Sequence, residues 1–428
     1  MTNSTLKPAT AQQWLAYIEA LHPKSIAMGL ERVSAVAKNL HIKPSFPIIT
    51  VAGTNGKGST CAMLSQVYTE AGYVVGCYTS PHLLRYNERV RINQQDIADS
   101  DLCTAFEAVE KARGSIALTY FEMGTLAAMW HFCQSKVDVV VMEVGLGGRL
   151  DAVNIFEPAC CIVTTIDLDH MEYLGDTREK IGFEKAGIFR QNVLAICGDE
   201  NPPNSLVDYA KQIKAPLKLI NRDFAVKKVV NGWQYSENKE DLLLPDLGLQ
   251  GEFQLNNAAC VVCAVQHMQA VLPVKYNQIC NALQAVTLIG RFYLIQSNPN
   301  IIVDVAHNPH AALSLAHNLQ ATVCAGKTLA VFAMLADKDI NGVIQAVSPH
   351  ISQWFIADNH SVRGAKAQDL HNKLIQHNPN AAIELFVDVA SALDAACKIA
   401  AKNDRIIVFG SFYTVADAIA HISSKEIE

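Results

Sequence analysis

The chain has 428 residues, of which 50% are hydrophobic and 18% are charged, and its formal net charge is −6. A chain of this length exceeds one ordinary hydrophobic core, so we expect two domains. The composition, without low-complexity stretches, is typical of a folded protein of enzyme size. No block of basic residues is present to bind a phosphate backbone, which excludes nucleic acid as the expected partner.

The first residues predict a helix rather than a targeting segment. Thr10 and Gln13 have the spacing of a capping box, and no basic segment followed by an apolar core precedes them. No apolar stretch reaches the length of about eighteen residues that spans a bilayer. The twelve cysteines are scattered, and Cys260 and Cys263 lie in a helical run without a second pair, so we expect packing rather than zinc binding. These features predict a cytoplasmic protein with no membrane partner.

A strand, a glycine-rich loop, a lysine and two hydroxyl residues follow one another at residues 47–60, PIITVAGTNGKGST, directly before a helical stretch. The glycines let backbone N–H groups face an anion, the helix adds its positive end, and Lys57 adds a full charge. The run departs from the common P-loop pattern, because Val51 stands six residues before Lys57 and Gly58 follows the lysine directly. The expected occupant is a nucleoside triphosphate, and the alternative is a turn whose glycines serve only packing.

Short apolar runs of strand character alternate with helical stretches along the whole chain. In the first part these runs are ITVAG, VVGCYTS, VDVVVMEVG and CCIVTTIDL, and in the second part they are NIIVDVAHN, LAVFAML, WFIADN, ELFVDV and RIIVFGSF. Such alternation predicts parallel sheets with helices on both faces. We therefore expect an α/β protein.

A change of pattern near residues 288–298 marks the expected domain boundary. It separates a P-loop-containing, mostly parallel sheet domain at residues 1–290 from a smaller, Rossmann-like α/β domain with five strands at residues 291–428. Residues 221–252 form short alternating runs that predict a small antiparallel excursion. Within it, residues 238–241 read NKED like the guanine-reading tetrad of GTPases, but a polar turn between hairpin strands is the wrong place for base recognition.

Polar residues follow several predicted strands, at the end of the sheet where ligands collect. Glu143 ends the run VVVME before a glycine-rich segment, and Mg²⁺ prefers oxygen ligands, so Glu143 is the first expected metal ligand. The alternative for Glu143 is a capping role. Ser80 and His170 follow two other strands; a lone histidine is more often structural, although Asp167 and Asp169 beside it favour a ligand role.

Two further features involve a lysine and a polar cluster. Lys185 lies on an amphipathic helical stretch, where the residues alone predict a solvated surface position. Asp304, His307 and Asn308 close a predicted strand, and Pro309 then opens a helix. Proline early in a helix is favourable, so a structural explanation covers Pro309 but not the polar residues before it.

Together these segments resemble the folylpolyglutamate synthase family of ATP-dependent ligases, which is related to the Mur ligases. The resemblance spans nearly the whole chain and rests on ITVAGTNGKGST, YTSPHLLRYNERVRI, FEMGTLAA, EVGLGGRLDAVN, TTIDLDHMEYLGDT, EKAGI, GRF, DVAHNPHAA and GSFYTV. It implies a monomeric enzyme that uses ATP, one or two Mg²⁺ ions and, as a further candidate, a monovalent cation. The implied substrates are L-glutamate, dihydropteroate and the γ-carboxylate of folates, joined through an acyl phosphate.

The resemblance also implies roles for individual residues, and Lys185 matches a lysine that carries a carbamate in this family. The implied catalytic residues are Lys57, Lys185 and His307. The implied metal ligands are Ser80, Glu143 and His170. The implied nucleotide contacts are Thr54, Asn55, Gly56, Lys57, Gly58, Ser59, Asn257, Arg291 and Asp304. The implied contacts to the pterin and to glutamate are Gly29, Leu30, Glu31, Arg32, Thr119, Tyr120, Phe121, Glu122, Leu150, Asp151, Ala152 and Ser411.

Three alternatives stay open. The pterin motif is similar in enzymes that only lengthen folate glutamate tails, so the chain could be a folylpolyglutamate synthase alone. A Mur-type amino-acid ligase needs a further N-terminal domain, and only 46 residues precede Pro47. A nucleotide-controlled binding protein or GTPase-like switch is disfavoured by the misplaced NKED tetrad.

The chain departs from the family pattern at Phe253, where the family often has histidine. This difference weakens an adenine-reading role for Gln254.

Overall fold

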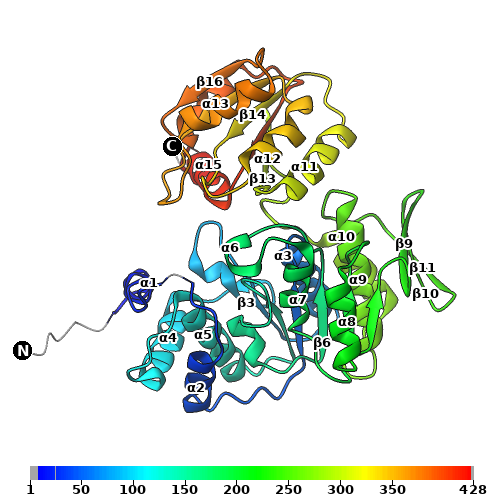
Figure 1. Cartoon of the computed structure of the whole chain (residues 1–428). Coiled ribbons are helices and arrows are strands. Elements are labelled where there is room, and N and C mark those ends of the chain that lie inside the picture. The colour runs from blue at the N-terminus through cyan, green and yellow to red at the C-terminus, as the bar shows by residue number, and fades with distance from the viewer. Residues whose placement is uncertain (1–7, 25, 426–428) are drawn as a thin grey trace, which may run out of the picture. The chain divides into compact units, whose positions relative to one another are not determined.

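The computed structural model describes residues 8–24 and 26–425 (Figure 1). The chain divides into two compact units. Unit 1 comprises Met1–Asp246 and Asn256–Val286, and unit 2 comprises Leu247–Leu255 and Thr287–Glu428. Each unit is built on its own sheet, which agrees with the predicted α/β class.

An eight-stranded sheet forms the centre of unit 1, in the order β4-β3-β2-β5-β1-β6-β7-β8. The strands are β1 (Ile48–Ala52), β2 (Val75–Tyr78), β3 (Val90–Ile92), β4 (Gln95–Asp96), β5 (Val139–Glu143), β6 (Cys160–Val163), β7 (Ala195–Cys197) and β8 (Leu217–Leu219). All neighbours from β2 to β8 pair in parallel, whereas β3 and β4 are antiparallel additions. Every residue of β1 and β5 is buried, as expected for parallel strands covered on both faces.

Helices surround this sheet, and α3 packs against β1, β2 and β5. The helices are α1 (Ala11–Glu19), α2 (Glu31–Asn39), α3 (Lys57–Glu70), α4 (Asp99–Arg113), α5 (Tyr120–Gln134), α6 (Met171–Leu174), α7 (Arg178–Ala186), α8 (Asn204–Gln212), α9 (Phe253–Met268) and α10 (Tyr276–Ala285). The predicted capping box is confirmed, because Gln13 N–H donates to Thr10 Oγ1 at 3.3 Å and Gln13 Oε1 accepts from the Thr10 N–H. Within the described part of the chain, no helix is long and apolar enough to cross a membrane.

The predicted antiparallel excursion is a three-stranded sheet in the order β11-β10-β9. Its strands are β9 (Phe224–Val229), β10 (Gly232–Glu237) and β11 (Glu240–Leu244). Asn238 and Lys239 have positive φ angles of 51° and 68° in the two-residue turn between β10 and β11. The NKED tetrad therefore spans a hairpin turn, as predicted, and does not follow a buried parallel strand.

Unit 2 contains a six-stranded sheet in the order β12-β13-β17-β14-β15-β16. The strands are β12 (Tyr293–Ser297), β13 (Asn300–Asp304), β14 (Thr328–Phe332), β15 (Gln353–Ala357), β16 (Ile383–Phe386) and β17 (Arg405–Phe409), and the helices are α11 (Pro309–Ala321), α12 (Ile340–Val347), α13 (Ala367–His377), α14 (Val389–Ile399) and α15 (Phe412–Lys425). The five predicted strands are parallel, and β12 is an additional antiparallel edge. The sequence pattern missed β12 because it is only partly buried and its register shifts between Leu294 and Gln296.

Candidate active site

The carboxyl ends of four neighbouring strands of unit 1, β2, β5, β1 and β6, carry the predicted polar residues. Val51 of β1 lies in register with Glu143 of β5, so the two strands end at the same level. The phosphate loop follows β1, Ser80 follows β2, and His170 follows β6. Parallel pairing therefore brings the predicted phosphate and metal residues to one edge of the sheet.

Two glycines of the phosphate loop are required by their backbone conformation and by close neighbours. Gly53 and Gly56 have φ angles of +152° and +88°, which L side chains rarely adopt. A Cβ atom on Gly56 would lie 2.5 Å from Asn257 Oδ1, and one on Gly53 would lie 1.9 Å from Thr164 Oγ1. The loop is thus packed against Asn257, a predicted nucleotide contact from α9. A larger residue at Gly53 or Gly56 would therefore displace the loop or its neighbours Thr164 and Asn257.

Lys57 begins α3 and folds back over the phosphate loop. Its Nζ donates hydrogen bonds to the carbonyl oxygens of Gly53 at 3.1 Å and Thr54 at 3.2 Å. The ammonium group therefore lies over the loop, next to the N-terminus of a 14-residue helix. A cation and a helix N-terminus at one point provide strong attraction for a polyphosphate.

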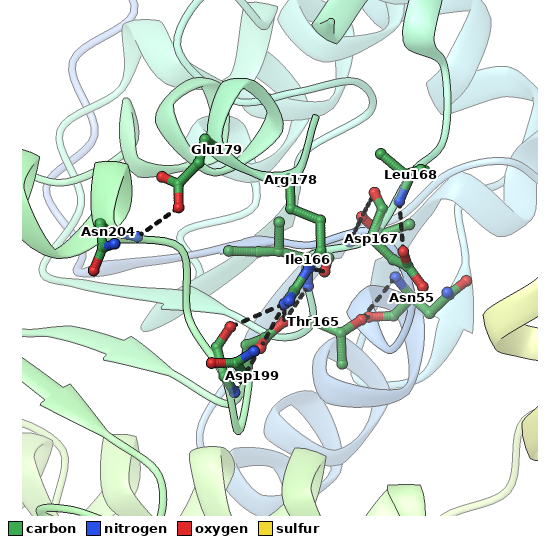
Figure 2. A network of polar contacts seen from close by, with 11 residues as sticks. Asn55, Thr165, Ile166, Asp167, Leu168, Arg178, Glu179, Asp199 and Asn204 are labelled. Carbon is green, nitrogen blue, oxygen red and sulfur yellow. Dashed lines mark hydrogen bonds and ion pairs between the residues drawn. The ribbon is translucent and has the colours of Figure 1, made fainter. Parts of the chain in front are cut away.

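Thr165 and Asp167 support the phosphate loop from the segment after β6 (Figure 2), and Thr164 does so as well. The sequence analysis did not identify Thr164 and Thr165. The hydroxyl groups of Thr164 and Thr165 donate to the Asn55 carbonyl oxygen at 2.6 and 3.1 Å. Thr54 Oγ1 donates to the Asp167 carbonyl oxygen at 3.1 Å and accepts from the Asp167 N–H at 3.0 Å. Two consecutive threonines directly after a buried strand were the available signal. The phosphate loop is thus fixed by its neighbour in the sheet.

The predicted metal ligands Ser80 and Glu143 lie together. Glu143 is only 4% exposed, and its Oε2 accepts a hydrogen bond from the Ser80 N–H at 3.1 Å. His170 has a φ of 50° before α6, and its Nε2 lies 3.9 Å from Asp169 Oδ2. A carboxylate, a hydroxyl and an imidazole at the same edge of the sheet are donor types that suit a divalent cation.

Lys185 is buried on α7, with 3% exposure, so the surface position predicted from the residues alone is wrong. The pKa of Lys185 is lowered to about 7, mainly by burial and also by the positive charge of Lys57, while Asp169 opposes the shift. The helical pattern failed here because Lys185 lies on the buried face of α7, with Ile181, Gly182 and Ala186. Lys185 thus lies within the electrostatic reach of Lys57 in the phosphate loop and of Asp169, the residue before His170.

The three segments predicted to bind the pterin also meet within unit 1. Arg32 Nη2 donates to Glu122 Oε1 at 3.0 Å, and the Gly29 N–H donates to the Leu150 carbonyl oxygen at 3.4 Å. Thr119 and Glu122 form a capping box at the start of α5. Residues 29–32, 119–122 and 150–152 therefore form one region, although most of these side chains also have structural roles.

Other members of this region are held by burial and ring contacts. Asp151 accepts from the N–H groups of Leu146 and Val153, both at 2.9 Å, and burial raises the pKa of Asp151 to about 7. The Arg89 guanidinium lies over the Tyr120 ring, with its Cζ atom 5.5 Å from the ring centroid. A Cβ atom on Gly145 would lie 2.6 Å from the Phe121 ring. The region combines aromatic surface with charged groups, which suits a flat ring that carries polar edges.

The predicted residues of unit 2 gather around Phe412, which the sequence analysis did not single out. The Arg291 guanidinium lies 5.3 Å from the centre of the Phe412 ring, and the His307 ring lies 6.2 Å from it. Asp304 accepts from the N–H groups of Phe292 and Ala306, both at 2.8 Å. Burial raises the pKa of Asp304 to about 6, and the charge of Arg291 opposes this shift.

Ser411 is 2% exposed and caps the start of α15. Its Oγ accepts from Asn359 Nδ2 at 3.1 Å and from the Thr414 N–H at 3.0 Å. Asn359 was also not identified by the sequence analysis, since it follows β15 without a distinctive motif. Arg291, Asp304, His307 and Ser411 all lie at or beyond one end of the sheet of unit 2, next to β13 and β17.

Comparisons with known proteins match both units. The Mur ligase middle domain matches residues 51–265, and the Mur ligase glutamate ligase domain matches residues 290–412. The dihydrofolate synthase/folylpolyglutamate synthase of Haemophilus influenzae is 41% identical to the chain, over 97% of the chain and 99% of that protein. The protein of the same name from Escherichia coli is 42% identical, over 96% of the chain and 95% of that protein.

Solved structures agree with these matches. E. coli FolC in complex with DHPP and ADP superposes with a TM-score of 0.93 at 42% identity, covering 98% of this chain and 99% of that one. A bifunctional folylpolyglutamate synthase/dihydrofolate synthase with Mn, AMPPNP and L-glutamate bound has a TM-score of 0.89 at 42% identity, covering 97% of this chain and 100% of that one.

The two matched domains, with the phosphate loop at the edge of the unit 1 sheet, define a Mur-type ligase. This class confirms the expected enzyme, and the prediction that disfavoured a binding protein or GTPase-like switch is correct. Within the class, the chain belongs to the dihydrofolate synthase/folylpolyglutamate synthase family.

Proposed function

We propose that the chain joins L-glutamate to dihydropteroate and to the γ-carboxylate of folate or tetrahydrofolate polyglutamates, with ATP and a divalent metal ion. The observation that carries this proposal is the edge of the unit 1 sheet. There the phosphate loop with Lys57 adjoins the Ser80 and Glu143 pair, in a chain 41–42% identical to two enzymes named for both activities.

The reaction needs an activated carboxyl group, because a carboxylate is a poor acylating agent. The substrate carboxylate attacks the γ-phosphorus of ATP, which gives an acyl phosphate and ADP. The amine of L-glutamate then attacks the acyl carbon, phosphate leaves with the bonding electron pair, and the amine loses a proton. The protein's contribution is alignment and charge neutralisation, without a covalent enzyme intermediate.

Residues of the sheet edge have distinct tasks in this scheme. The amides of residues 54–59 and the ammonium of Lys57 hold the phosphates, and Asn257 supports the loop that it contacts. Ser80, Glu143 and His170 would hold Mg²⁺, which their donor atoms suit. When bound, the metal ion neutralises phosphate charge and favours in-line attack.

Lys185 is proposed to carry a carbamate. Its amine is buried and has a pKa of about 7, so a large fraction is neutral near physiological pH and can attack carbon dioxide. The nitrogen loses one proton in this step, and the product replaces a buried cation with an oxygen anion. That exchange removes the repulsion from Lys57 and adds an oxygen donor beside the metal residues.

The remaining residues are assigned to substrates. The region of residues 29–32, 119–122 and 150–152 binds the pterin, and Arg291 and Asp304 contact the nucleotide. His307 and Ser411 serve the incoming glutamate. In this assignment residues 1–290 form the ATP-binding domain and residues 291–428 the glutamate ligase domain, and the enzyme is a cytoplasmic monomer, which light scattering on the purified chain would test.

The test supplies dihydropteroate and tetrahydrofolate separately, each with MgATP and isotope-labelled L-glutamate, and weighs the products by mass spectrometry. We expect a labelled glutamyl product from both acceptors, and ADP release only when acceptor and amine are both present. A product from tetrahydrofolate alone would reduce the proposal to a folylpolyglutamate synthase, an activity for which a 33% identical relative from Lacticaseibacillus casei is named. No product from either acceptor would contradict the proposal.

A further inference from the structure

Arg178, at the start of α7, and Asp199, which follows β7, form an ion pair beside the phosphate loop's supporting segment. Arg178 Nη2 donates to both carboxylate oxygens of Asp199, at 2.9 and 3.0 Å. The Asp199 side chain is only 8% exposed, against 36% for Arg178. Because burying a carboxylate costs free energy, such a pair is better explained by the geometry that it imposes than by a gain in stability.

Both side chains of this pair also bind the backbone of Ile166, in the segment after β6 (Figure 2). Asp199 Oδ2 accepts from the Ile166 N–H at 2.7 Å, and Arg178 Nε donates to the Ile166 carbonyl oxygen at 2.8 Å. The N–H and the carbonyl group of one residue are therefore both held by the pair. Two charge-assisted hydrogen bonds fix Ile166 more firmly than neutral contacts would.

The residues on either side of Ile166 hold the phosphate loop. The Thr165 carbonyl oxygen accepts from the Thr54 N–H at 2.7 Å, and Thr165 Oγ1 accepts from the Asn55 N–H at 3.2 Å. Asp167 exchanges two hydrogen bonds with Thr54 Oγ1, at 3.0 and 3.1 Å. A shift of Ile166 would therefore move the atoms to which the loop is bound.

The pair also anchors the helix that carries Lys185. Arg178 Nη2 donates to the Asn201 carbonyl oxygen at 3.0 Å, which ties the start of α7 to the segment after β7. The next residue, Glu179, accepts from the N–H groups of Asn204 and Ser205 at 3.1 and 2.8 Å, at the start of α8. Lys185 lies about two turns further along α7. One ion pair thus connects the supports of the phosphate loop and of Lys185.

We propose that Arg178 and Asp199 are positioning residues for ATP. Their ion pair holds Ile166 and, through Thr165 and Asp167, keeps the amides of the phosphate loop directed at the triphosphate. In this role neither side chain touches the nucleotide. The inference rests on the proposed function, because it requires ATP to occupy this loop.

Substitutions that preserve size separate geometry from bulk. Asp199→Asn places an NH₂ group opposite one of the N–H donors that now bind the carboxylate, whichever way the amide is turned. Arg178→Lys keeps the charge, but a single ammonium cannot reproduce the planar fork that reaches Asp199 and Ile166 together. Arg113 provides a matched control: it binds both oxygens of Glu110 at 2.6 Å on α4 and also contacts Tyr17. Arg113→Gln therefore removes a comparable ion pair elsewhere in unit 1.

The experiment measures binding of AMPPNP with Mg²⁺ by calorimetry on the full chain, together with the thermal midpoint of every variant. We expect Asp199→Asn and Arg178→Lys to weaken AMPPNP binding by about 10- to 100-fold, the range for residues that orient direct ligands. Arg113→Gln should bind AMPPNP within about two-fold of the unaltered protein. The KM for L-glutamate should stay unchanged in all three variants, whereas the KM for ATP should rise only in the first two.

The outcomes distinguish this inference from the function on which it rests. Failure of the unaltered protein to bind AMPPNP would contradict the proposed function, whereas equal binding by the unaltered and Arg178→Lys proteins would overturn the inference alone. Hydrogen exchange on the unaltered protein covers the case of a variant that does not fold. In the unaltered protein, AMPPNP should slow hydrogen exchange at residues 165–168 and 199–201 as well as at residues 53–58. Slower exchange at residues 53–58 alone would overturn the inference.

Discussion

Gly56→Ala tests the phosphate loop most sharply, because the chain offers a matched control. Gly56 and Gly72 have nearly equal φ angles, +88° and +92°, and alanine is strained by a positive φ at both positions. They differ in surroundings: a Cβ atom on Gly56 would lie 2.5 Å from Asn257 Oδ1, whereas one on Gly72 has nothing within 4 Å. The pair therefore separates backbone strain from damage to the site.

Backbone strain and the clash with Asn257 set the expected losses of stability and of AMPPNP affinity. An L residue in the left-handed region costs about 1–2 kcal/mol, and for a unit of this size each kcal/mol lowers the thermal midpoint by about 2–4 °C. Gly72→Ala should show this loss and bind AMPPNP as the unaltered protein does. In Gly56→Ala the loop or Asn257 must also move by roughly 1 Å, and a displacement of that size can cost about 100-fold in a positioned site.

The assay combines thermal unfolding with calorimetric titration of AMPPNP and Mg²⁺ on both variants. We expect the thermal midpoint of Gly56→Ala to equal that of Gly72→Ala or to lie below it. AMPPNP binding should be weakened by about 10- to 100-fold in Gly56→Ala only. Equal AMPPNP affinities of the two variants would refute the reasoning, since they would show that the Gly56 turn does not shape the nucleotide site.

Three further predictions concern the same site. Lys57→Ala and Glu143→Ala should each lower ADP release by about 100-fold or more with the circular dichroism spectrum unchanged, and full turnover by either would contradict their roles. The pKa of Lys185 is lowered to about 7, mainly by burial, so its amine becomes neutral as the pH rises from about 6 to 8. The increase in ADP-release rate caused by added bicarbonate should therefore grow over this pH range. Lys185→Arg should be inactive, and bicarbonate should not restore its activity. Arg32→Gln, which removes the partner of buried Glu122, should raise the KM for the pterin acceptor about ten-fold and leave that for ATP within about two-fold, and a matching rise in both would count against a pterin site there.

Local motifs were sufficient to predict the phosphate loop and the strand-end residues. The loop, its lysine and the start of its helix are contiguous in residues 47–60. Glu143 ends a strand of the parallel sheet, and Ser80 and His170 each follow one. A parallel sheet brings such residues to one edge, whatever their separation along the chain. Predicting that these residues lie at one edge of the sheet therefore required no knowledge of tertiary contacts beyond that rule.

Features that depend on tertiary contacts could not be predicted in this way. Lys185 occupies an unremarkable position on an amphipathic helix, and only the packing around α7 shows that it is buried. Arg178 and Asp199 are separated by 20 intervening residues, and Asp199 follows β7, a strand of three residues that gives almost no pattern. Asn257 and the phosphate loop meet because α9 returns to the sheet edge, a contact that no local spacing encodes.

The proposed reaction requires this sheet edge to transfer a phosphoryl group from ATP to a substrate carboxylate. An oxygen-18 transfer experiment tests it directly: tetrahydrofolate labelled in its γ-carboxylate is incubated with MgATP and L-glutamate, and the released phosphate is analysed by mass spectrometry. An acyl phosphate predicts one labelled oxygen in each phosphate that accompanies a glutamyl product. Unlabelled phosphate released together with that product would contradict the proposed reaction.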